Sequence, residues 1–148
     1  MKLYSPNFQN NQIIPTVFTS DGSNKCPDFI IEKVPDSARS LVILCHDPDA
    51  TAGIPWVHWL AWGLPPVDKI IGGQLPEGSI NGLNSFGNYG YDGPSPNPGT
   101  GLYRYVFTIF AMIDEVDLGN LSSYEEVVQY LNGRTVEHSS WVGTYERK

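Results

Sequence analysis

The sequence predicts a mainly β protein that forms one domain over residues 1–148. Twelve prolines and fifteen glycines are spread along the chain and divide it into short segments, a pattern typical of antiparallel β proteins with many turns. The length of 148 residues is close to that of an ordinary domain. A chain of this size buries roughly 70 % of the surface that its unfolded form exposes. We therefore expect one hydrophobic core that needs no disulfide or metal to hold it together.

The first two predicted strands cover Ser40–His46 and Trp56–Leu64. The first is an almost continuous apolar run, as expected of a central strand that is buried on both faces. The second ends at Pro65-Pro66, because neither proline can donate a hydrogen bond to a neighbouring strand. Regular alternation along the second strand places four side chains on one face: Trp56, His58, Leu60 and Trp62.

The third predicted strand, Tyr103–Ile113, is the longest. Residues 82–101 precede it and form the part of the chain that is richest in glycine and proline. A loop of this length without secondary structure is uncommon inside a compact domain and is more often functional than idle. Alternation places Tyr103, Tyr105, Phe107 and Ile109 on one face of the strand, and Arg104, Val106, Thr108 and Phe110 on the other.

One helix is clearly indicated, over Tyr124–Leu131. Ser123 and Glu126 have the spacing of a capping box at its start. Gly133 follows at a position that commonly ends a helix, and Ser140–Tyr145 is predicted to be a closing strand. Four apolar residues recur at the spacing of one helix face: Tyr124, Val127, Val128 and Leu131.

The charge distribution disfavours two classes of partner. The net charge is -7, and the only basic cluster is Arg147-Lys148 at the end of the chain. Nucleic acids and anionic membrane surfaces both attract clusters of lysine and arginine. We therefore expect no nucleic-acid partner and no stable membrane association. The N-terminal residues lack the apolar core of a signal peptide, and no run approaches the ~20 apolar residues of a membrane helix. These features predict a cytoplasmic protein.

The cysteines and possible metal ligands give weak signals. Cys45 lies in an apolar run and is interpreted as a small buried hydrophobe, although a disulfide with Cys26 stays open as a minor alternative. A metal site is also a minor alternative, because the residue types are suitable but their spacing matches no ligand motif. The residues concerned are His46, Asp47, Asp49 and His58.

Catalytic motifs are not recognisable in the glycine-rich part of the chain. Ser85 is one position out of register for a nucleophile elbow, and no strand-to-helix turn follows it. The spacing of Gly87, Gly90 and Gly93 matches neither a phosphate-binding loop nor a dinucleotide fingerprint. We therefore predict no cofactor, no metal and no enzymatic activity, and keep an enzyme of unrecognised mechanism as an alternative.

His58 admits two interpretations. A lone histidine on an apolar strand is most often an ordinary core residue. The surroundings of His58 favour a pocket instead, because Trp56 shares its strand face and Asp47 and Asp49 leave the preceding strand. The glycine- and proline-rich loop also leads into a strand that begins with two tyrosines. We therefore place His58 at the centre of a candidate binding pocket.

Four motifs together resemble the phosphatidylethanolamine-binding protein family, also called Raf kinase inhibitor-like. Weaker similarity extends from Thr19–Gly22 to Gly143–Arg147, so the resemblance covers nearly the whole chain. The ending just after Arg147 is similar to that of short bacterial and archaeal members, which lack the C-terminal helix beside the pocket. The motifs are Asp47-Pro48-Asp49-Ala50, Trp56-Val57-His58-Trp59, Asn84-Ser85-Phe86-Gly87 with Gly90-Tyr91 and Gly93-Pro94, and Arg104-Tyr105 with Phe107.

The resemblance implies a Greek-key β-sandwich with a large central sheet and a few short peripheral helices. It also implies a binding or regulatory module whose small pocket accepts phosphate, acetate or a phosphorylated head group. Inhibition of serine proteases or carboxypeptidases is the alternative function. Family structures have a cis peptide bond just before the pocket tryptophan, which here is the Ile54–Pro55 bond. The positions that match the family pocket are Asp47, Asp49, Trp56, His58, Gly93, Pro94 and Tyr105.

Two departures from the family pattern affect this predicted pocket. Tyr103 stands where the family usually has a histidine, which removes a potential positive charge, while strand alternation still directs its ring toward the pocket. Pro96-Asn97 replaces a Pro-Pro pair. We expect protonated His58, favoured by a nearby carboxylate, to be the main donor to the anion. The expected partner is a small anion such as phosphate or a phosphorylated head group, with a protease or a kinase as the alternative protein partner.

Overall fold

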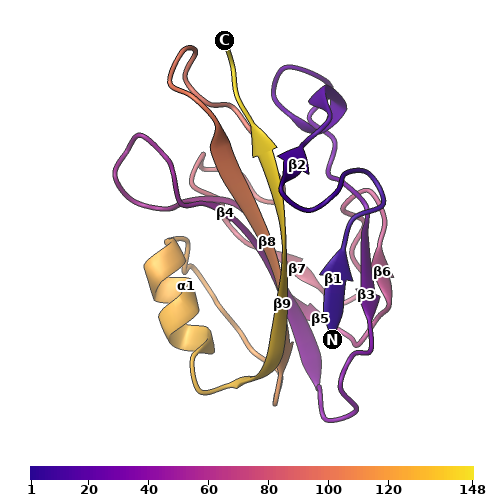
Figure 1. The fold of residues 1–148 in the computed structure, drawn as a ribbon. Coiled ribbons are helices and arrows are strands. Elements are labelled where there is room, and N and C mark those ends of the chain that lie inside the picture. The colour runs from indigo at the N-terminus through magenta and orange to yellow at the C-terminus, as the bar shows by residue number, and fades with distance from the viewer.

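The structure is a computed structural model that describes residues 1–148, and its main element is a six-stranded sheet (Figure 1). The strand order is β2-β9-β8-β4-β5-β7, and every neighbouring pair is antiparallel except β2 with β9. Its strands are β2 (Gln12–Ile13), β4 (Ser40–Asp47), β5 (Trp56–Leu64), β7 (Ile80–Asn81), β8 (Tyr103–Met112) and β9 (Thr135–Tyr145).

A smaller sheet covers one face of the large sheet, and the helix α1 (Tyr124–Leu131) covers the other (Figure 1). The smaller sheet has the order β1-β3-β6, and a short 3-10 helix, η1 (Thr16–Phe18), follows β2. This arrangement confirms the predicted mainly β sandwich with a large central sheet and short peripheral helices. The strands of the smaller sheet are β1 (Lys2–Tyr4), β3 (Phe29–Glu32) and β6 (Lys69–Ile70).

Each face of the large sheet buries its own apolar cluster. Between the two sheets, the rings of Phe29 and Phe107 lie 4.7 Å apart at their centroids. On the other face, Val127 and Leu131 of α1 pack against Val42 and other apolar residues of the sheet. The residues of β8 divide between the clusters as alternation predicts, since Tyr103, Tyr105, Phe107 and Ile109 all belong to the cluster between the sheets.

The three predicted central strands occur where the apolar patterns place them. β4 extends one residue further than predicted, to Asp47; β5 has the predicted bounds, and β8 ends one residue earlier, at Met112. β9 is longer than predicted and begins at Thr135. In its first half, apolar and polar residues alternate poorly and the side chains are largely exposed. This half still pairs with the end of β8, where Thr135 lies opposite Met112, and this pairing extends the strand.

The alternation expected along β5 is wrong in part. Cys45 pairs with Trp59 while His46 pairs with Val57, so His58 is an extra residue in the register. An extra residue reverses the side on which later side chains emerge. Trp56 and His58 consequently lie together on the side of the smaller sheet, whereas Leu60 and Trp62 pack on the side of α1.

The helix and its start agree with the prediction. The backbone N–H of Glu126 donates to Oγ of Ser123 at 3.2 Å, and the Ser123 hydroxyl donates to the Glu126 carboxylate at 2.8 Å. Gly133 follows the helix with a φ of 81°, a conformation that glycine adopts without strain. The buried residues Val127 and Leu131 belong to the predicted apolar stripe.

The Ile54–Pro55 peptide bond and the two cysteines were the subject of further predictions. The Ile54–Pro55 bond is not cis, so that prediction is wrong. The trans form is intrinsically favoured by about 0.5–1 kcal/mol before proline, and the surrounding loop is exposed, with Ile54 62 % accessible.

Cys26 and Cys45 are both buried and free. No helix has the length and hydrophobicity needed to span a membrane; the cytoplasmic location stays a prediction.

Candidate ligand-binding pocket

A small cavity of about 180 Å³ lies where the end of β4 meets the starts of β5 and β8. These ends meet because β4 is antiparallel to both neighbours, which pairs Asp47 with Trp56 and His46 with Val106. The loop from β4 to β5 and the loop that leads into β8 flank this end of the sheet (Figure 1). The cavity is lined by Asp47, Ala50, Thr51, Ala52, Trp56, His58, Phe86, Ser95, Pro96, Asn97, Tyr103 and Tyr105.

Asp47 supplies the one charged side chain of this lining. One of its carboxylate oxygens accepts a hydrogen bond from the N–H of Asp49 at 2.8 Å. The other oxygen has no partner within the protein and is open to the cavity. Burial raises the pKa of Asp47 to about 6, and the hydrogen bond from Asp49 only partly opposes this increase. Asp47 therefore takes up a proton under mildly acidic conditions.

His58 is buried, with 3 % of its surface accessible, and its ring has a defined orientation. Nδ1 lies 2.6 Å from the carbonyl oxygen of Asp92. Because a carbonyl oxygen can only accept, Nδ1 carries the hydrogen, and Nε2 of the neutral ring is an acceptor. The rings of Phe86 and Tyr105 meet the imidazole edge-to-face, at centroid distances of 5.2 and 5.1 Å.

The charge state expected for His58 is wrong. Burial lowers its pKa to about 4, although the contacts with Asp92 and Gly93 favour the protonated ring. The desolvation of an imidazolium inside this aromatic cluster outweighs those favourable contacts. His58 is consequently neutral at pH 7 and presents an acceptor to the cavity in place of the predicted cationic donor.

The two tyrosines of β8 both line the cavity. The hydroxyl of Tyr103 lies 2.6 Å from Oγ1 of Thr100, so it is already engaged in one hydrogen bond. The hydroxyl of Tyr105 has no partner within the protein and is open to the cavity. Burial raises the pKa of Tyr105, so its hydroxyl keeps its proton and can donate to a ligand.

Phe86 is a wall of the cavity that the sequence reasoning did not select. Its ring stands edge-to-face to Trp56 at 5.8 Å, as well as to His58. Ser85 anchors the loop beside it, since Val57 donates its N–H to Ser85 Oγ and Ser85 donates its N–H to the Val57 carbonyl, both at 2.8 Å. A large aromatic residue in a glycine-rich loop was the signal that the sequence offered for this role.

Asn97 connects the two loops at the mouth of the cavity. Its side-chain amide donates to Oγ1 of Thr51 at 3.1 Å, and both residues line the cavity. Asn97 belongs to the pair that departs from the family pattern. A second proline could not form this bond, because proline has no side-chain donor. The departure therefore adds a polar link across the pocket entrance.

Asp49, Gly93 and Pro94 are absent from the cavity lining. Asp49 accepts three hydrogen bonds from Arg104, from its backbone N–H and its guanidinium, at 2.9 to 3.0 Å. These bonds tie the loop after β4 to β8. The N–H of Gly93 donates to Oδ1 of Asn24 at 2.8 Å. These three residues hold the loops that form the pocket and do not face its interior.

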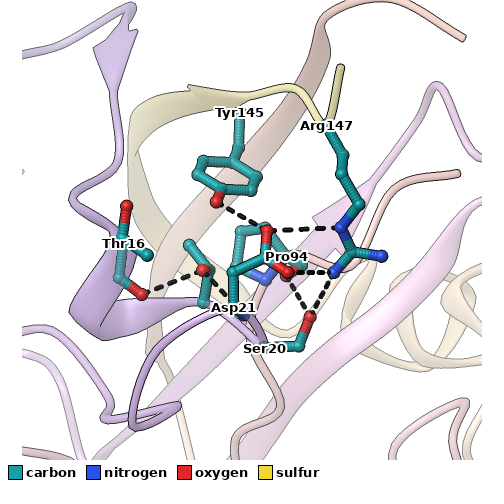
Figure 2. Close-up of polar contacts among 7 residues, drawn as sticks. Thr16, Ser20, Asp21, Pro94, Tyr145 and Arg147 are labelled. Carbon is teal, nitrogen blue, oxygen red and sulfur yellow. Dashed lines mark hydrogen bonds and ion pairs between the residues drawn. The ribbon is translucent and has the colours of Figure 1, made fainter. Parts of the chain in front are cut away.

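Pro94 belongs to a polar network that links the segment after η1 and the C-terminal end of the chain to the pocket loop (Figure 2). Its carbonyl oxygen accepts from the N–H and the hydroxyl of Ser20, at 3.0 and 3.1 Å. Arg147 binds the carboxylate of Asp21 through two nitrogens, and it donates to Ser20 as well. Tyr145 donates its hydroxyl to the same carboxylate at 2.7 Å. The two segments of weaker family similarity, Thr19–Gly22 and Gly143–Arg147, therefore meet here.

The pocket has an acidic character. No lysine or arginine lines it, and no group of three or more His, Cys, Asp or Glu side chains is placed to hold a metal ion. A wider groove of about 870 Å³ lies between α1 and β9, but none of the predicted site residues lines it. The small cavity is the place where the predicted residues Asp47, Trp56, His58, Tyr103 and Tyr105 come together.

Comparisons with known proteins agree with this architecture. Residues 4–146 match the family model described as phosphatidylethanolamine-binding protein. A UPF0098 protein of Methanothermobacter thermautotrophicus is 34 % identical over 153 residues, which cover 99 % of each chain. The crystal structure of YbcL from Escherichia coli, described as a new member of the mammalian PEBP family, has a TM-score of 0.91 and 25 % identity. That comparison covers 99 % of this chain and 98 % of YbcL.

A more distant similarity concerns the fold alone. The carboxypeptidase Y inhibitor, in a structure with its cognate proteinase, is 18 % identical and has a TM-score of 0.62, over 94 % of this chain and 76 % of that one. The family match, in contrast, extends over nearly the whole chain and includes every residue that lines the cavity. The chain therefore belongs to the phosphatidylethanolamine-binding protein family.

Proposed function

We propose that this protein is a binding module for a small acidic group, such as phosphate or a phosphorylated head group. Three polar groups without protein partners meet in the cavity: the Tyr105 hydroxyl, Nε2 of His58 and one carboxylate oxygen of Asp47. This convergence is the observation that carries the proposal. The volume of about 180 Å³ is below the ~300–1,000 Å³ of most ligand pockets, so it suits a head group and not a larger molecule.

The arrangement supports binding more than catalysis. Nδ1 of His58 is occupied by the Asp92 carbonyl, and no serine or cysteine hydroxyl or thiol is hydrogen-bonded to the ring. A nucleophile paired with a base is the usual sign of covalent catalysis. We therefore propose that the chain has no enzymatic activity of its own. Aromatic walls around the polar groups lower the local dielectric and strengthen each hydrogen bond to a ligand.

Binding of an anion in this pocket should be coupled to uptake of a proton. An ionised Asp47 repels an anion, whereas protonated Asp47 is neutral and can donate a hydrogen bond. Because the pKa of Asp47 is about 6, the competent form is abundant near pH 5 and scarce near pH 8. The ligand supplies the proton itself, or the pocket takes it from solvent. Either route favours the bound complex at lower pH.

The first test measures anion affinity as a function of pH. Methanesulfonate is a suitable probe, because its own charge does not change in this range. Its affinity should be about a hundredfold higher near pH 5 than near pH 8, because only about 1 % of molecules are competent at the higher pH. Isothermal titration calorimetry in chloride-free buffer would measure this difference, and parallel titrations with phosphate and O-phosphorylethanolamine would compare ligands.

Two variants serve as controls for this titration. Asp47→Asn should bind methanesulfonate with little dependence on pH, because the titrating carboxyl is gone. His58→Ala, checked for its fold by circular dichroism, should lose affinity for phosphate, because monoprotonated phosphate can donate a hydrogen bond to Nε2 and methanesulfonate cannot. Equal phosphate affinity of wild type and His58→Ala, or a pH-independent methanesulfonate affinity of the wild type, would contradict the proposed site.

Tyr103→His is predicted to strengthen phosphate binding. Tyr103 lines the cavity and brings a neutral hydroxyl that already bonds Thr100. A charged donor is worth about 1.5–3 kcal/mol to an anion, against about 1 for a neutral pair. The variant should therefore gain about tenfold in phosphate affinity at mildly acidic pH. Calorimetry at about pH 5.5 would measure this gain.

Tyr103→Phe is the matched control for that substitution. It also removes the hydrogen bond to Thr100, but it adds no charge. Its phosphate affinity should equal that of the wild type or be lower. A folded Tyr103→His variant that binds phosphate no better than Tyr103→Phe would show that position 103 does not contact the ligand.

Protease inhibition is the second candidate function. Exposed apolar side chains occur on the loops and strand starts around the pocket: Ile54 is 62 %, Phe86 41 % and Leu102 56 % accessible. Exposed apolar patches of this kind often mark protein contacts. Inhibition assays with a serine protease and a carboxypeptidase would distinguish this function, and an Ile54→Asp variant should lose any inhibition that depends on this surface. A kinase partner can be tested on the same surface by the same variant.

A further inference from the structure

Asp92 contacts His58 through its main chain at two points. Its carbonyl oxygen lies 2.6 Å from Nδ1 of the imidazole. Its backbone N–H donates to the carbonyl oxygen of His58 at 2.9 Å. One residue thus fixes both the ring and the backbone of His58, although 34 positions separate them in sequence.

The carboxylate of Asp92 is held by three asparagine side chains. Asn24 donates to one oxygen at 3.1 Å, and Asn84 and Asn88 donate to the other at 2.7 and 3.0 Å. A carboxylate has only acceptors, so it matches three converging NH₂ groups. An asparagine at position 92 would direct its own NH₂ toward one of these donors. The network therefore depends on the aspartate itself.

The same asparagines hold the neighbouring loops. Oδ1 of Asn24 accepts the N–H of Gly93 at 2.8 Å. Asn84, which is 2 % accessible, accepts the N–H of Phe86 at 2.9 Å through its own Oδ1. One polar network consequently places His58 and also Phe86, the aromatic wall that contacts its ring at 5.2 Å.

We propose that Asp92 is a positioning residue that holds His58 as the Nδ1–H tautomer, with Nε2 left for the ligand. The neutral ring can then only accept a hydrogen bond from the cavity side. Together with the open carboxylate oxygen of Asp47, this arrangement selects ligand groups that carry a hydrogen, such as a monoprotonated phosphomonoester or a carboxylic acid. The ligand class rests on the function proposed above; the control of the tautomer does not.

The test reads the tautomer of His58 directly, without any ligand. The ¹⁵N chemical shifts of the imidazole nitrogens distinguish the Nδ1–H form from the Nε2–H form. The wild type should show the Nδ1–H form almost alone near pH 7, and Asp92→Asn should show a mixture. Phosphate affinity near pH 5 should fall about tenfold in Asp92→Asn, as when the partner that orients a ligating histidine is removed.

Two further variants keep the test decisive. Asn88→Ala removes one exposed donor to Asp92, and it should shift the tautomer in the same direction by less, even if Asp92→Asn fails to fold. Asp28→Asn is the matched control, because the Asp28 carboxylate also accepts a hydrogen bond, in this case from the N–H of Gly72, outside this network. It should leave the His58 shifts unchanged.

The outcomes separate the two proposals. Wild-type ¹⁵N shifts in a folded Asp92→Asn variant would overturn the positioning role; if that variant does not fold, unchanged shifts in Asn88→Ala would do so. A shifted tautomer in protein that binds neither phosphate nor methanesulfonate would support the positioning role and reject the proposed function.

Discussion

Replacing Asp47 with asparagine should stabilise the protein at neutral pH by about 1–2 kcal/mol, because each unit of pKa shift corresponds to about 1.4 kcal/mol and water partly screens this carboxyl at the cavity. The pKa of Asp47 is raised from 3.8 to about 6 in the folded protein. The folded state therefore loses stability as the pH rises from 3.8 through 6, where the buried carboxyl must ionise. Asparagine keeps the oxygen that accepts the Asp49 N–H and carries no charge to bury.

Urea unfolding of wild type and Asp47→Asn at about pH 4 and pH 7 would measure this effect. The difference in unfolding free energy should be large at neutral pH and close to zero at the lower pH. The low pKa values of His46 and His58 destabilise both proteins at acid pH, so they cancel in the difference. Equal stability at neutral pH would show that Asp47 is not held in an unfavourable charged state.

Asp49→Asn is the control with the opposite sign. The hydrogen bonds from Arg104 hold the pKa of Asp49 below its usual value. Its ionised form therefore stabilises the folded protein at neutral pH, and this contribution is lost as the pH falls from 3.8 through that lowered pKa. The variant should be less stable than the wild type at neutral pH. Two aspartates separated by one residue should thus respond in opposite directions to the same substitution.

Gly93→Ala should destabilise the protein by at least about 3 kcal/mol, because the methyl group has no room. A Cβ at this position would lie 2.2 Å from the carbonyl oxygen of Phe18 and 3.0 Å from Cα of Thr19. Both are backbone atoms, so neither can rotate away. The substitution should push apart η1 and the loop that forms one wall of the pocket, and phosphate affinity should fall with stability.

Gly87→Ala separates this steric effect from ordinary glycine effects. Gly87 has a φ of 84°, but a Cβ there would meet nothing within 4 Å. Its replacement should cost only about 1–2 kcal/mol, from the left-handed backbone conformation. Thermal and urea unfolding of the two variants would rank them. If Gly93→Ala were as stable as Gly87→Ala, the close packing at Gly93 would be disproved.

The sequence alone was sufficient for the elements whose signals are local. The apolar run of β4, the bounds of β5 and the helix with its Ser123 cap all follow from periodicity and capping within a few residues. The two faces of β8 also follow, because its pairing with β4 has no register shift. The family motifs predicted the sandwich and a pocket with Asp47, Trp56, His58 and Tyr105, and strand alternation added Tyr103.

The tertiary structure decided the charges and the roles within the pocket. An extra residue in the pairing of β4 with β5 places His58 beside Tyr105, and burial makes it neutral. Asp49, Gly93 and Pro94 bind other segments and do not face the cavity. Local sequence cannot determine these features, because desolvation and hydrogen-bond partners depend on residues dozens of positions away. Asp92 reaches His58 only after the chain has folded.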